Sequence, residues 1–374
     1  MRGVIAARTV VAGDGLLSPG AVTVQGGRVT AVSRDVPDHV EVRPGYLVPG
    51  FVDLHCHGGG GASVGDGQEA VATAVRTHRR HGTTTMGASL VSAPPDRLLS
   101  DVAALAELVQ DGLVAGTHVE GPWIATSMRG AHDPTTLRPP DPAEVGRVLG
   151  AARGTLHMVT LAPELEHGPA AVRRFADAGV LAALGHTDAD HEQARAGIEA
   201  GATVATHLFN QMRPIHHREP GPVPALLADP RVHVELVADG VHLHPAVVAL
   251  VRQAVPADRI VLVTDAMSAA GAADGRYLLG GLEVDVERGV ARLRDGGALA
   301  GSTLTMAEAF RRVVTDCGFA VADAVLAAST TPARLLRHDD VGVIAAGRRA
   351  DLVHLDDDLR PRQVWYGGQV VPSA

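Results

Sequence analysis

The sequence predicts an α/β protein, a (β/α)8 TIM barrel with a small β-sandwich domain formed by both chain termini. Two observations lead to this prediction. Apolar, strand-like runs alternate with helix-like stretches rich in Ala, Arg and Glu, the pattern of repeated βα units with a parallel sheet. Short alternating strands stand before and after this region. The 374 residues are enough for one large α/β barrel or two medium domains.

The two ends of the chain share one sequence pattern. Near the N-terminus, short alternating runs such as residues 21–24 are separated by turns such as Gly26-Gly27. The same pattern returns near the C-terminus, for example in residues 350–355. We therefore expect the two ends to form one β-sandwich that flanks the barrel: residues 1–46 (N-terminal part of the sandwich), 47–338 (barrel) and 339–374 (C-terminal part).

The middle of the chain offers eight barrel strands, which is the number that closes a (β/α)8 barrel. They are expected near residues 50–56, 83–90, 113–119, 156–161, 180–185, 203–207, 232–237 and 260–264. After the last of these, alternating runs between Gly271 and Gly301 predict a short β-insertion. Active sites of such barrels lie at the C-terminal ends of the strands, so the insertion is expected near the mouth.

The composition narrows the classes of function that the protein can have. A content of 46% hydrophobic and 20% charged residues is ordinary for a soluble globular protein, and the net charge of -9 argues against nucleic-acid binding. No window approaches ~20 uninterrupted apolar residues, and the N-terminus lacks an export signal, so neither a membrane partner nor export is expected. Two cysteines offer no disulfide framework, which suits a cytoplasmic protein.

Polar residues follow the predicted strands where a barrel would place its active site. They are His55 and His57 after the first strand, Glu120 after the third, His186 after the fifth, His207 after the sixth, Asp239 and His242 after the seventh, and Asp265 after the eighth. So many groups converging on one mouth are hard to explain by packing alone.

His55 and His57 stand at i and i+2, so that on one strand they project to the same side and can share a metal. An isolated pair of this kind is more often structural. Here the pair follows a buried, apolar strand and precedes the loop 58–61, whose glycines let the backbone approach a ligand. Cys56, between them, points the other way and is expected to pack.

Glu120 ends its strand at Gly121-Pro122, which leaves the carboxylate at the strand tip. The chain contains no lysine, so a carbamylated lysine bridge is impossible and Glu120 is the best carboxylate ligand and possible bridge. With His186 and His207 it forms a plausible N2O metal set. Asp265 ends the last strand, where a carboxylate can take a proton from water and pass it to a leaving group.

These residues lie in motifs that resemble the amidohydrolase superfamily and, within it, the N-acetylglucosamine-6-phosphate deacetylases. The resemblance covers nearly the whole chain, and its motifs lie at residues 49–58, 118–122, 185–187, 206–212, 218–221, 238–242, 264–266 and 299–306. The first motif belongs to the whole superfamily. The glutamate motif at 118–122, the asparagine-methionine motif at 206–212 and the motif at 218–221 look specific to the deacetylases.

The resemblance implies hydrolysis of N-acetylglucosamine 6-phosphate to glucosamine 6-phosphate and acetate, a step of amino sugar catabolism and cell-wall recycling. It implies a principal divalent metal on Glu120, His186 and His207, with Asp265 as catalytic acid and base. His55 and His57 make a second metal site available, so we expect one or two metals per subunit. Zinc is preferred, and iron, cobalt and manganese also suit these ligands.

The resemblance also assigns substrate contacts. His132 is expected to touch the substrate and to polarise the acetyl carbonyl. The full predicted set is Ala131, His132, Asn210, Gln211, Arg218, Asp239, His242, Ser302, Thr303 and Leu304. Arg218 and His242 supply donors for a dianionic phosphate. The resemblance further implies a homodimer in which Arg218 serves the neighbouring subunit. His78, His81, His216 and His217 are expected to be solvated histidines without a role.

Three alternatives remain open. The same chemistry on N-acetylgalactosamine 6-phosphate is possible, because the sequence does not distinguish substrates that differ in the configuration of one hydroxyl group. A cyclic amide or dipeptide hydrolase of the superfamily is another, although such enzymes commonly use the lysine bridge that this chain lacks. A non-catalytic scaffold is the third, but it would be expected to have lost ligands or the acid, and all of them are present.

Overall fold

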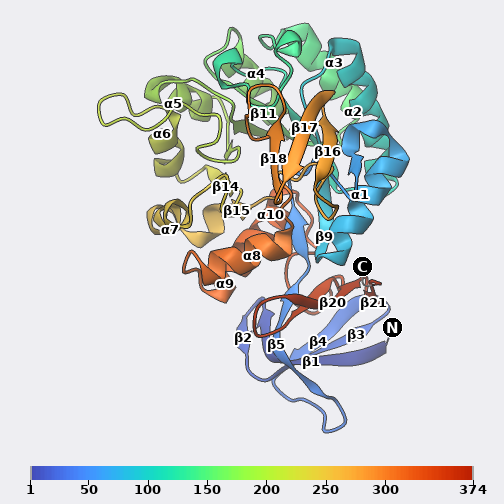
Figure 1. Ribbon diagram of the computed structural model, residues 1–374. Coiled ribbons are helices and arrows are strands. Elements are labelled where there is room, and N and C mark those ends of the chain that lie inside the picture. Colours follow the sequence, from blue (N-terminus) through green and yellow to red (C-terminus); the bar gives the residue numbers. More distant parts are fainter. Residues whose placement is uncertain (1, 373–374) are drawn as a thin grey trace.

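The computed structural model describes residues 2–372 and consists of a barrel and a small sheet domain (Figure 1). The barrel is one sheet of eight strands in the order β15-β14-β13-β12-β11-β10-β9-β6, and every neighbouring pair is parallel. Its strands are β6 (Phe51–Asp53), β9 (Thr83–Leu90), β10 (Gly116–Glu120), β11 (Leu156–Leu161), β12 (Leu181–Leu184), β13 (Val204–Ala205), β14 (His233–Leu236) and β15 (Ile260–Leu262). All eight predicted strands are confirmed.

The first and last strands meet at the mouth and complete the barrel. Just beyond their ends, the amide of Asp265 donates to the carbonyl of His55 at 2.9 Å. Below this contact, Asp53 accepts hydrogen bonds from the amide and the hydroxyl of Thr264, at 3.2 and 2.5 Å. The barrel closure therefore sets the distance between two predicted site residues, His55 and Asp265.

Helices cover the outside of the barrel (Figure 1). They are α1 (Gln68–Arg80), α2 (Pro95–Gln110), α3 (Pro142–Ala152), α4 (Gly168–Asp177), α5 (His191–Glu199), α6 (Pro222–Ala228), α7 (Pro245–Ala254), α8 (Met306–Thr315), α9 (Val321–Val325) and α10 (Thr331–Leu335). Several begin at acceptors for free backbone amides: Asp141 caps α3, and Asp190 with Gln193 forms a capping box on α5. No helix within residues 2–372 is both long and apolar enough to cross a membrane.

Both ends of the chain form one further sheet, in the order β21-β20-β19-β5-β1-β3-β4 with β2 paired to β1. Its strands are β1 (Arg2–Ala12), β2 (Gly15–Leu17), β3 (Gly20–Gln25), β4 (Arg28–Ser33), β5 (Val42–Pro49), β19 (Leu352–Leu355), β20 (Pro361–Tyr366) and β21 (Gln369–Val370). β4 bonds to the segment before β19, since the amide of Val29 donates to Arg348 at 2.9 Å. The sheet thus folds back around a core that includes Val22, Leu47 and Trp365.

The two termini lie together in this small domain, as the shared strand pattern of their sequences predicts (Figure 1). β5 runs across residue 46 and leads through Gly50 into barrel strand β6. The domain limits at residues 46 and 339 stay predictions.

The predicted insertion after the last barrel strand is an antiparallel sheet of β16 (Gly275–Leu279), β17 (Leu282–Glu287) and β18 (Val290–Leu293). It shares a small core with Met267, Ala269 and Ala300, which flank the mouth, and Ala131 packs against this core. The insertion therefore forms part of the wall around the barrel opening. A short hairpin of β7 (Gly58–Gly59) and β8 (Ala62–Ser63) follows β6.

The expectation that His78 is solvated is wrong. This residue lies on α1 and is fully buried, and its Nε2 donates to the carbonyl of Gly58 at 2.8 Å. Cys56 Sγ lies 3.4 Å from the same nitrogen, and Cys56 is buried as predicted. His78 therefore supports the loop that follows the His55 to His57 segment, because α1 packs directly against it.

Candidate metal and catalytic site

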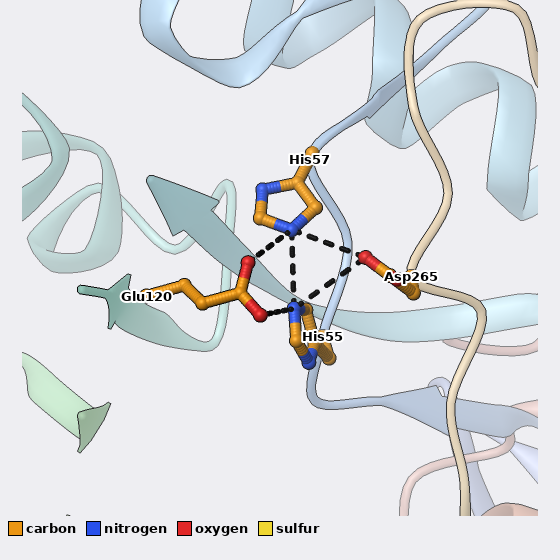
Figure 2. Close-up of side chains that lie close together, drawn as sticks. All are labelled: His55, His57, Glu120 and Asp265. Carbon is orange, nitrogen blue, oxygen red and sulfur yellow. Dashed lines mark hydrogen bonds and ion pairs between the residues drawn. The ribbon is translucent and has the colours of Figure 1, made fainter. Parts of the chain in front are cut away.

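Four predicted site residues meet at the mouth: His55, His57, Glu120 and Asp265 (Figure 2). His57 Nε2 lies 3.2 Å from Glu120 Oε2 and 3.2 Å from Asp265 Oδ1. His55 Nε2 lies 3.5 Å from Glu120 Oε1 and 3.6 Å from Asp265 Oδ1. The ends of β6, β10 and β15 thus bring two nitrogens and two carboxylates to one point.

Glu120 also faces a second pair of histidines. Its Oε1 lies 3.2 Å from His186 Nε2 and 2.9 Å from His207 Nε2, and these two nitrogens are 3.1 Å apart. The Glu120 carboxylate therefore stands between two histidine pairs, which is where a residue that serves both halves of a metal site has to be.

The spacing of the donor atoms suits a divalent cation. Ligand atoms at 2.0–2.2 Å from a tetrahedral metal are separated by about 3.4 Å. The facing nitrogen and oxygen atoms of these six residues lie 2.9 to 3.6 Å apart. His57 and His186 also donate through Nδ1 to the carbonyls of Ser89 and Met128, at 3.0 and 2.7 Å. A proton on Nδ1 leaves the lone pair of Nε2 free to bind a metal.

The electrostatics of the cluster favour positive charge. Burial lowers the pKa of His55 and His57, but the Glu120 charge and, for His57, the hydrogen bond with Asp265 outweigh it, and the pKa of His57 rises to about 9. Burial raises the pKa of Glu120, whereas the neighbouring histidines bring it well below its usual range. Burial lowers the pKa of His186 to about 4. A neutral His186 and ionised carboxylates are the states that metal binding requires.

Three of the side chains stand on strained backbone. His186, His207 and Asp265 have φ angles of 47°, 26° and 49°, in the left-handed region that costs a non-glycine residue about 1–3 kcal/mol. Each residue lies shortly after the end of a barrel strand, where this turn directs its side chain to the mouth. Gly121, after Glu120, has φ 71°, and a Cβ there would lie 2.3 Å from Ser92 Oγ. At these three positions a functional side chain occupies a strained backbone conformation, whereas Gly121, which has no side chain, adopts a positive φ without that strain.

His132 reaches the cluster from the loop after β10. Its Nδ1 accepts a hydrogen bond from the amide of Ser92 at 3.2 Å, so that the proton of a neutral ring is on Nε2. Nε2 lies 3.5 Å from Glu120 Oε2. The side chain therefore presents a hydrogen-bond donor beside the predicted metal ligands, as a group that binds a carbonyl oxygen must.

A small pocket lies over the cluster. Most predicted site residues line it: His57, Glu120, Ala131, His132, His186, His207, Asn210, Gln211, His242 and Asp265. His55 lies beneath and is fully buried. Leu279, from the β-insertion, forms part of the pocket wall. Groups from at least four barrel strands and their loops thus share one pocket.

Five predicted substrate residues do not line this pocket. Asp239 instead holds His242, whose Nδ1 lies 2.7 Å from the Asp239 carboxylate. Arg218 is exposed on the loop before α6. The segment 302–304 is taken up by internal contacts, because the Ser302 hydroxyl donates to the carbonyl of Thr264 at 2.6 Å and Leu304 is buried. Thr303 donates to the carbonyl of Gly289 at 2.6 Å. Their substrate contacts stay predictions.

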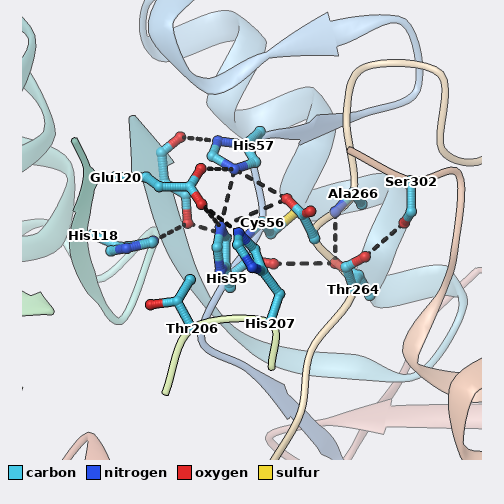
Figure 3. Close-up of polar contacts among 12 residues, drawn as sticks. His55, Cys56, His57, His118, Glu120, Thr206, His207, Thr264, Ala266 and Ser302 are labelled. Carbon is cyan, nitrogen blue, oxygen red and sulfur yellow. Dashed lines mark hydrogen bonds and ion pairs between the residues drawn. The ribbon is translucent and has the colours of Figure 1, made fainter. Parts of the chain in front are cut away.

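Two buried residues near the site, His118 and Glu235, were assigned no role from the sequence; Figure 3 shows the first of them. His118 packs edge-on against the His55 ring, with centroids 4.4 Å apart, and bonds to the hydroxyls of Ser89 and Thr160 at 2.9 Å each. Glu235, on β14, lies 3.2 Å from His55 Nδ1. A charged residue inside an apolar strand run was the available signal for Glu235, but only the closed barrel shows which histidine it faces.

Comparison with known proteins agrees with this geometry. The model of the amidohydrolase family matches residues 46–371. An N-acetylgalactosamine-6-phosphate deacetylase from Escherichia coli O157:H7 is 38% identical over 377 residues, 99% of each chain. An N-acetylglucosamine-6-phosphate deacetylase from Vibrio furnissii is 35% identical over 343 residues, 90% of this chain and 86% of that one.

Solved structures are similar over the whole chain. One is an Asp-to-Ala mutant of N-acetyl-D-glucosamine-6-phosphate deacetylase from Mycobacterium smegmatis in complex with N-acetyl-D-glucosamine-6-phosphate, which is 47% identical, has a TM-score of 0.96 and is matched over 100% of both chains. Another is the N-acetylglucosamine-6-phosphate deacetylase from Thermotoga maritima, 33% identical with a TM-score of 0.90, again over 100% of both chains.

A parallel barrel whose mouth gathers histidines and carboxylates is the architecture of a metal-dependent hydrolase. The chain belongs to the amidohydrolase family. Within that family, the relatives described above, at 33–47% identity, are by name deacetylases of phosphorylated N-acetyl hexosamines.

Proposed function

We propose that the protein is an N-acetylglucosamine-6-phosphate deacetylase, which hydrolyses the amide of its substrate to glucosamine 6-phosphate and acetate. The observation that carries the proposal is the position of Glu120 between two histidine pairs, with Asp265 and His132 beside them in one pocket. Full-length similarity to deacetylases with this substrate supports it. The retained ligands and acid argue against the scaffold alternative.

Glu120, His186 and His207 would hold the principal metal, and His55 and His57 would hold a second one with Glu120 as the shared ligand. A divalent metal bound there polarises the amide carbonyl and lowers the pKa of water toward ~7. We propose zinc as this metal, because two imidazoles and a carboxylate are ligands that zinc commonly takes, although iron, cobalt and manganese share this preference.

Asp265 is the proposed general base and then acid. It accepts a proton from the water that attacks the carbonyl carbon, and it returns that proton to the nitrogen as the C–N bond breaks. His132 donates its Nε2 proton in a hydrogen bond to the carbonyl oxygen, whose negative charge grows during the attack. The amine and the acetate then leave the pocket.

The sugar phosphate is proposed to lie across the pocket toward His242. The Asp239 carboxylate holds the Nδ1 side of that ring, which leaves Nε2 to face the pocket. Burial raises the pKa of Asp239, but the His242 hydrogen bond outweighs it and lowers the pKa. The Asp239 carboxylate thus fixes the orientation of the His242 ring, so that Nε2 can contact the phosphate. Asn210 and Gln211 supply further polar groups on the pocket wall.

We infer a homodimer in which Arg218 reaches the neighbouring site. In its own chain Arg218 is exposed and does not line the pocket, and no ion pair holds its side chain among residues 2–372. The same surface exposes Ile215 (54%), Val241 (40%) and Leu250 (61%) beside an apolar groove. A second copy that covered this groove would bury these side chains and bring its Arg218 to the phosphate. The cytoplasm, where sugar phosphates are made, is the proposed location.

The Arg218→Ala variant is expected to raise KM for the phosphorylated sugar by about 10–100-fold, since a charge-assisted hydrogen bond contributes about 1.5–3 kcal/mol. Mixing this variant with Asp265→Asn tests the partner's role. If Arg218 acts on the neighbouring subunit, heterodimers contain one intact site, and at substrate concentrations well below the KM of Arg218→Ala the mixture is more active than the sum of the separate variants. Acetate release that stays at the level of the separate variants would contradict the exchange of Arg218 between subunits.

The substrate assignment is tested by acetate release from three compounds: N-acetylglucosamine 6-phosphate, N-acetylgalactosamine 6-phosphate and unphosphorylated N-acetylglucosamine. We expect the highest kcat/KM for the first. The galacto epimer is the matched competitor, because a relative that acts on it by name is 38% identical over 99% of both chains. A higher kcat/KM for that epimer would transfer the assignment to it. Equal rates for phosphorylated and free sugar would contradict the proposed phosphate site.

A further inference from the structure

Glu235 is a buried acid that the proposed chemistry does not use. It lies on β14 with its side chain fully buried inside the barrel. One oxygen, Oε2, lies 3.2 Å from His55 Nδ1 and accepts a 3.2 Å hydrogen bond from the amide of His207. The same carboxylate oxygen therefore touches one histidine of each pair that flanks Glu120.

Packing alone does not explain this residue. Its other oxygen, Oε1, is buried without a hydrogen-bond partner among residues 2–372. Within the same residues, His55 is its one ion-pair partner, so no arginine neutralises it. A buried carboxylate destabilises a protein unless positive charge and hydrogen bonds offset its loss of hydration. A leucine would fill a similar volume without losing the hydration of a charge. Filling space therefore does not account for a carboxylate at this position.

The contact with His55 supplies the reason. Of the four histidines around Glu120, His57 and His186 face backbone carbonyls through Nδ1, and Nδ1 of His207 has no partner among the described residues. His55 is the one that faces a carboxylate. This contact puts a proton on Nδ1, turns the lone pair of Nε2 toward the metal position and makes the imidazole a stronger ligand.

The bond to His207 extends the effect to the other half of the site. His207 stands at φ 26°, a conformation that the surrounding structure has to hold. The backbone on each side of it is tied to one residue of β14: the amide of His207 donates to the Glu235 carboxylate, and the amide of Leu208 donates to the Glu235 carbonyl at 2.9 Å. Movement of Glu235 would therefore displace both histidine pairs.

We propose that Glu235 is a positioning residue that couples the two halves of the metal centre, by orienting His55 as a ligand and holding the backbone of His207. It sets the affinity of the site that includes His55, and with it the number of metals bound per subunit. The inference rests on the proposed function only in that the cluster binds divalent metal.

The test is metal binding by metal-depleted wild type and Glu235→Gln, measured by equilibrium dialysis and by the visible spectrum of added Co²⁺. The amide keeps the shape of the side chain and removes its charge. We expect the affinity of the second Co²⁺ to fall by about 10–100-fold and its spectrum to change, with the first Co²⁺ bound as in wild type. Glu235→Leu also removes the acceptor of the His207 amide, so it is expected to weaken the binding of both ions and to lower the melting temperature, since loss of one partner of a buried hydrogen-bonded pair is destabilising.

Glu144→Gln is the matched control. Glu144 is another buried acid, but its carboxylate bonds to Arg138 and Trp123. Wild-type binding is expected for this variant. Equal affinity of wild type and Glu235→Gln for both ions would overturn the inference, as would the same loss in Glu144→Gln. Wild type that binds no Co²⁺ would instead overturn the proposed function itself, and this inference with it.

Discussion

Replacement of Asp265 by Asn is expected to lower kcat for deacetylation by about 10²–10⁴-fold, the usual contribution of a general acid and base. Burial raises the pKa of the Asp265 carboxyl, but the His57 hydrogen bond and the charges of His55 and His57 bring it to about 2. The group is therefore ionised at neutral pH and can accept a proton, whereas an amide of the same shape cannot. Acetate release measures the loss.

Metal content separates this effect from damage to the site. If Asp265 acts on protons, the Asn variant keeps its bound metal near the wild-type level, as measured by elemental analysis after gel filtration. Asp285→Asn is the control, because Asp285 is an acid on the surface of the insertion, paired with Arg294. Near wild-type kcat in Asp265→Asn would remove Asp265 from the mechanism, and parallel loss of metal would make it a ligand instead.

The barrel and most of the pocket were predictable from the sequence because both depend on local patterns. A buried parallel strand needs a continuous apolar run, and all eight such runs became barrel strands. The ends of parallel strands meet at one edge, so that residues following the runs, such as His57, Glu120 and Asp265, had to lie near one another. For this part of the site, position along the chain was enough.

Pairings across the barrel were not predictable in the same way. Glu235 faces His55 because β14 and β6 lie on either side of β15 in a closed sheet, which no local pattern encodes. His78 was expected in solvent, because no motif of the sequence gave it a role. Its burial follows from the packing of α1 on the loop after His57. Both residues needed the three-dimensional arrangement.

The direction of side chains on loops was equally hidden. Ser302 was predicted to contact the substrate, but its hydroxyl donates to the carbonyl of Thr264 and does not line the pocket. Arg218 points into solvent from its own chain. A sequence motif identifies such residues. It does not show whether their side chains contact a ligand, support a strand or contact a partner subunit.

Removal of bound metal is expected to lower kcat/KM by at least about 10³-fold, because a Lewis-acid contribution of about 4 kcal/mol corresponds to three factors of ten. Every donor atom of the cluster lies within about one ligand-to-ligand distance of Glu120 or Asp265, so the pocket loses its electrophile when metal is absent. Dialysis against a chelator, followed by addition of zinc, iron, cobalt or manganese ions one at a time, measures the loss and shows which ions restore acetate release.

Glu120→Gln is expected to produce the same loss without restoration. Glu120 contacts all four histidines around the predicted metal positions, so a neutral amide in its place weakens every metal-binding arrangement that the cluster offers. Gln193→Glu, at the exposed start of α5, is a suitable control for a single exchange of amide and acid. A metal-free wild type with full activity would contradict the metal requirement. A Glu120→Gln variant that regains wild-type rates with added metal would show that the histidines alone can hold the ion.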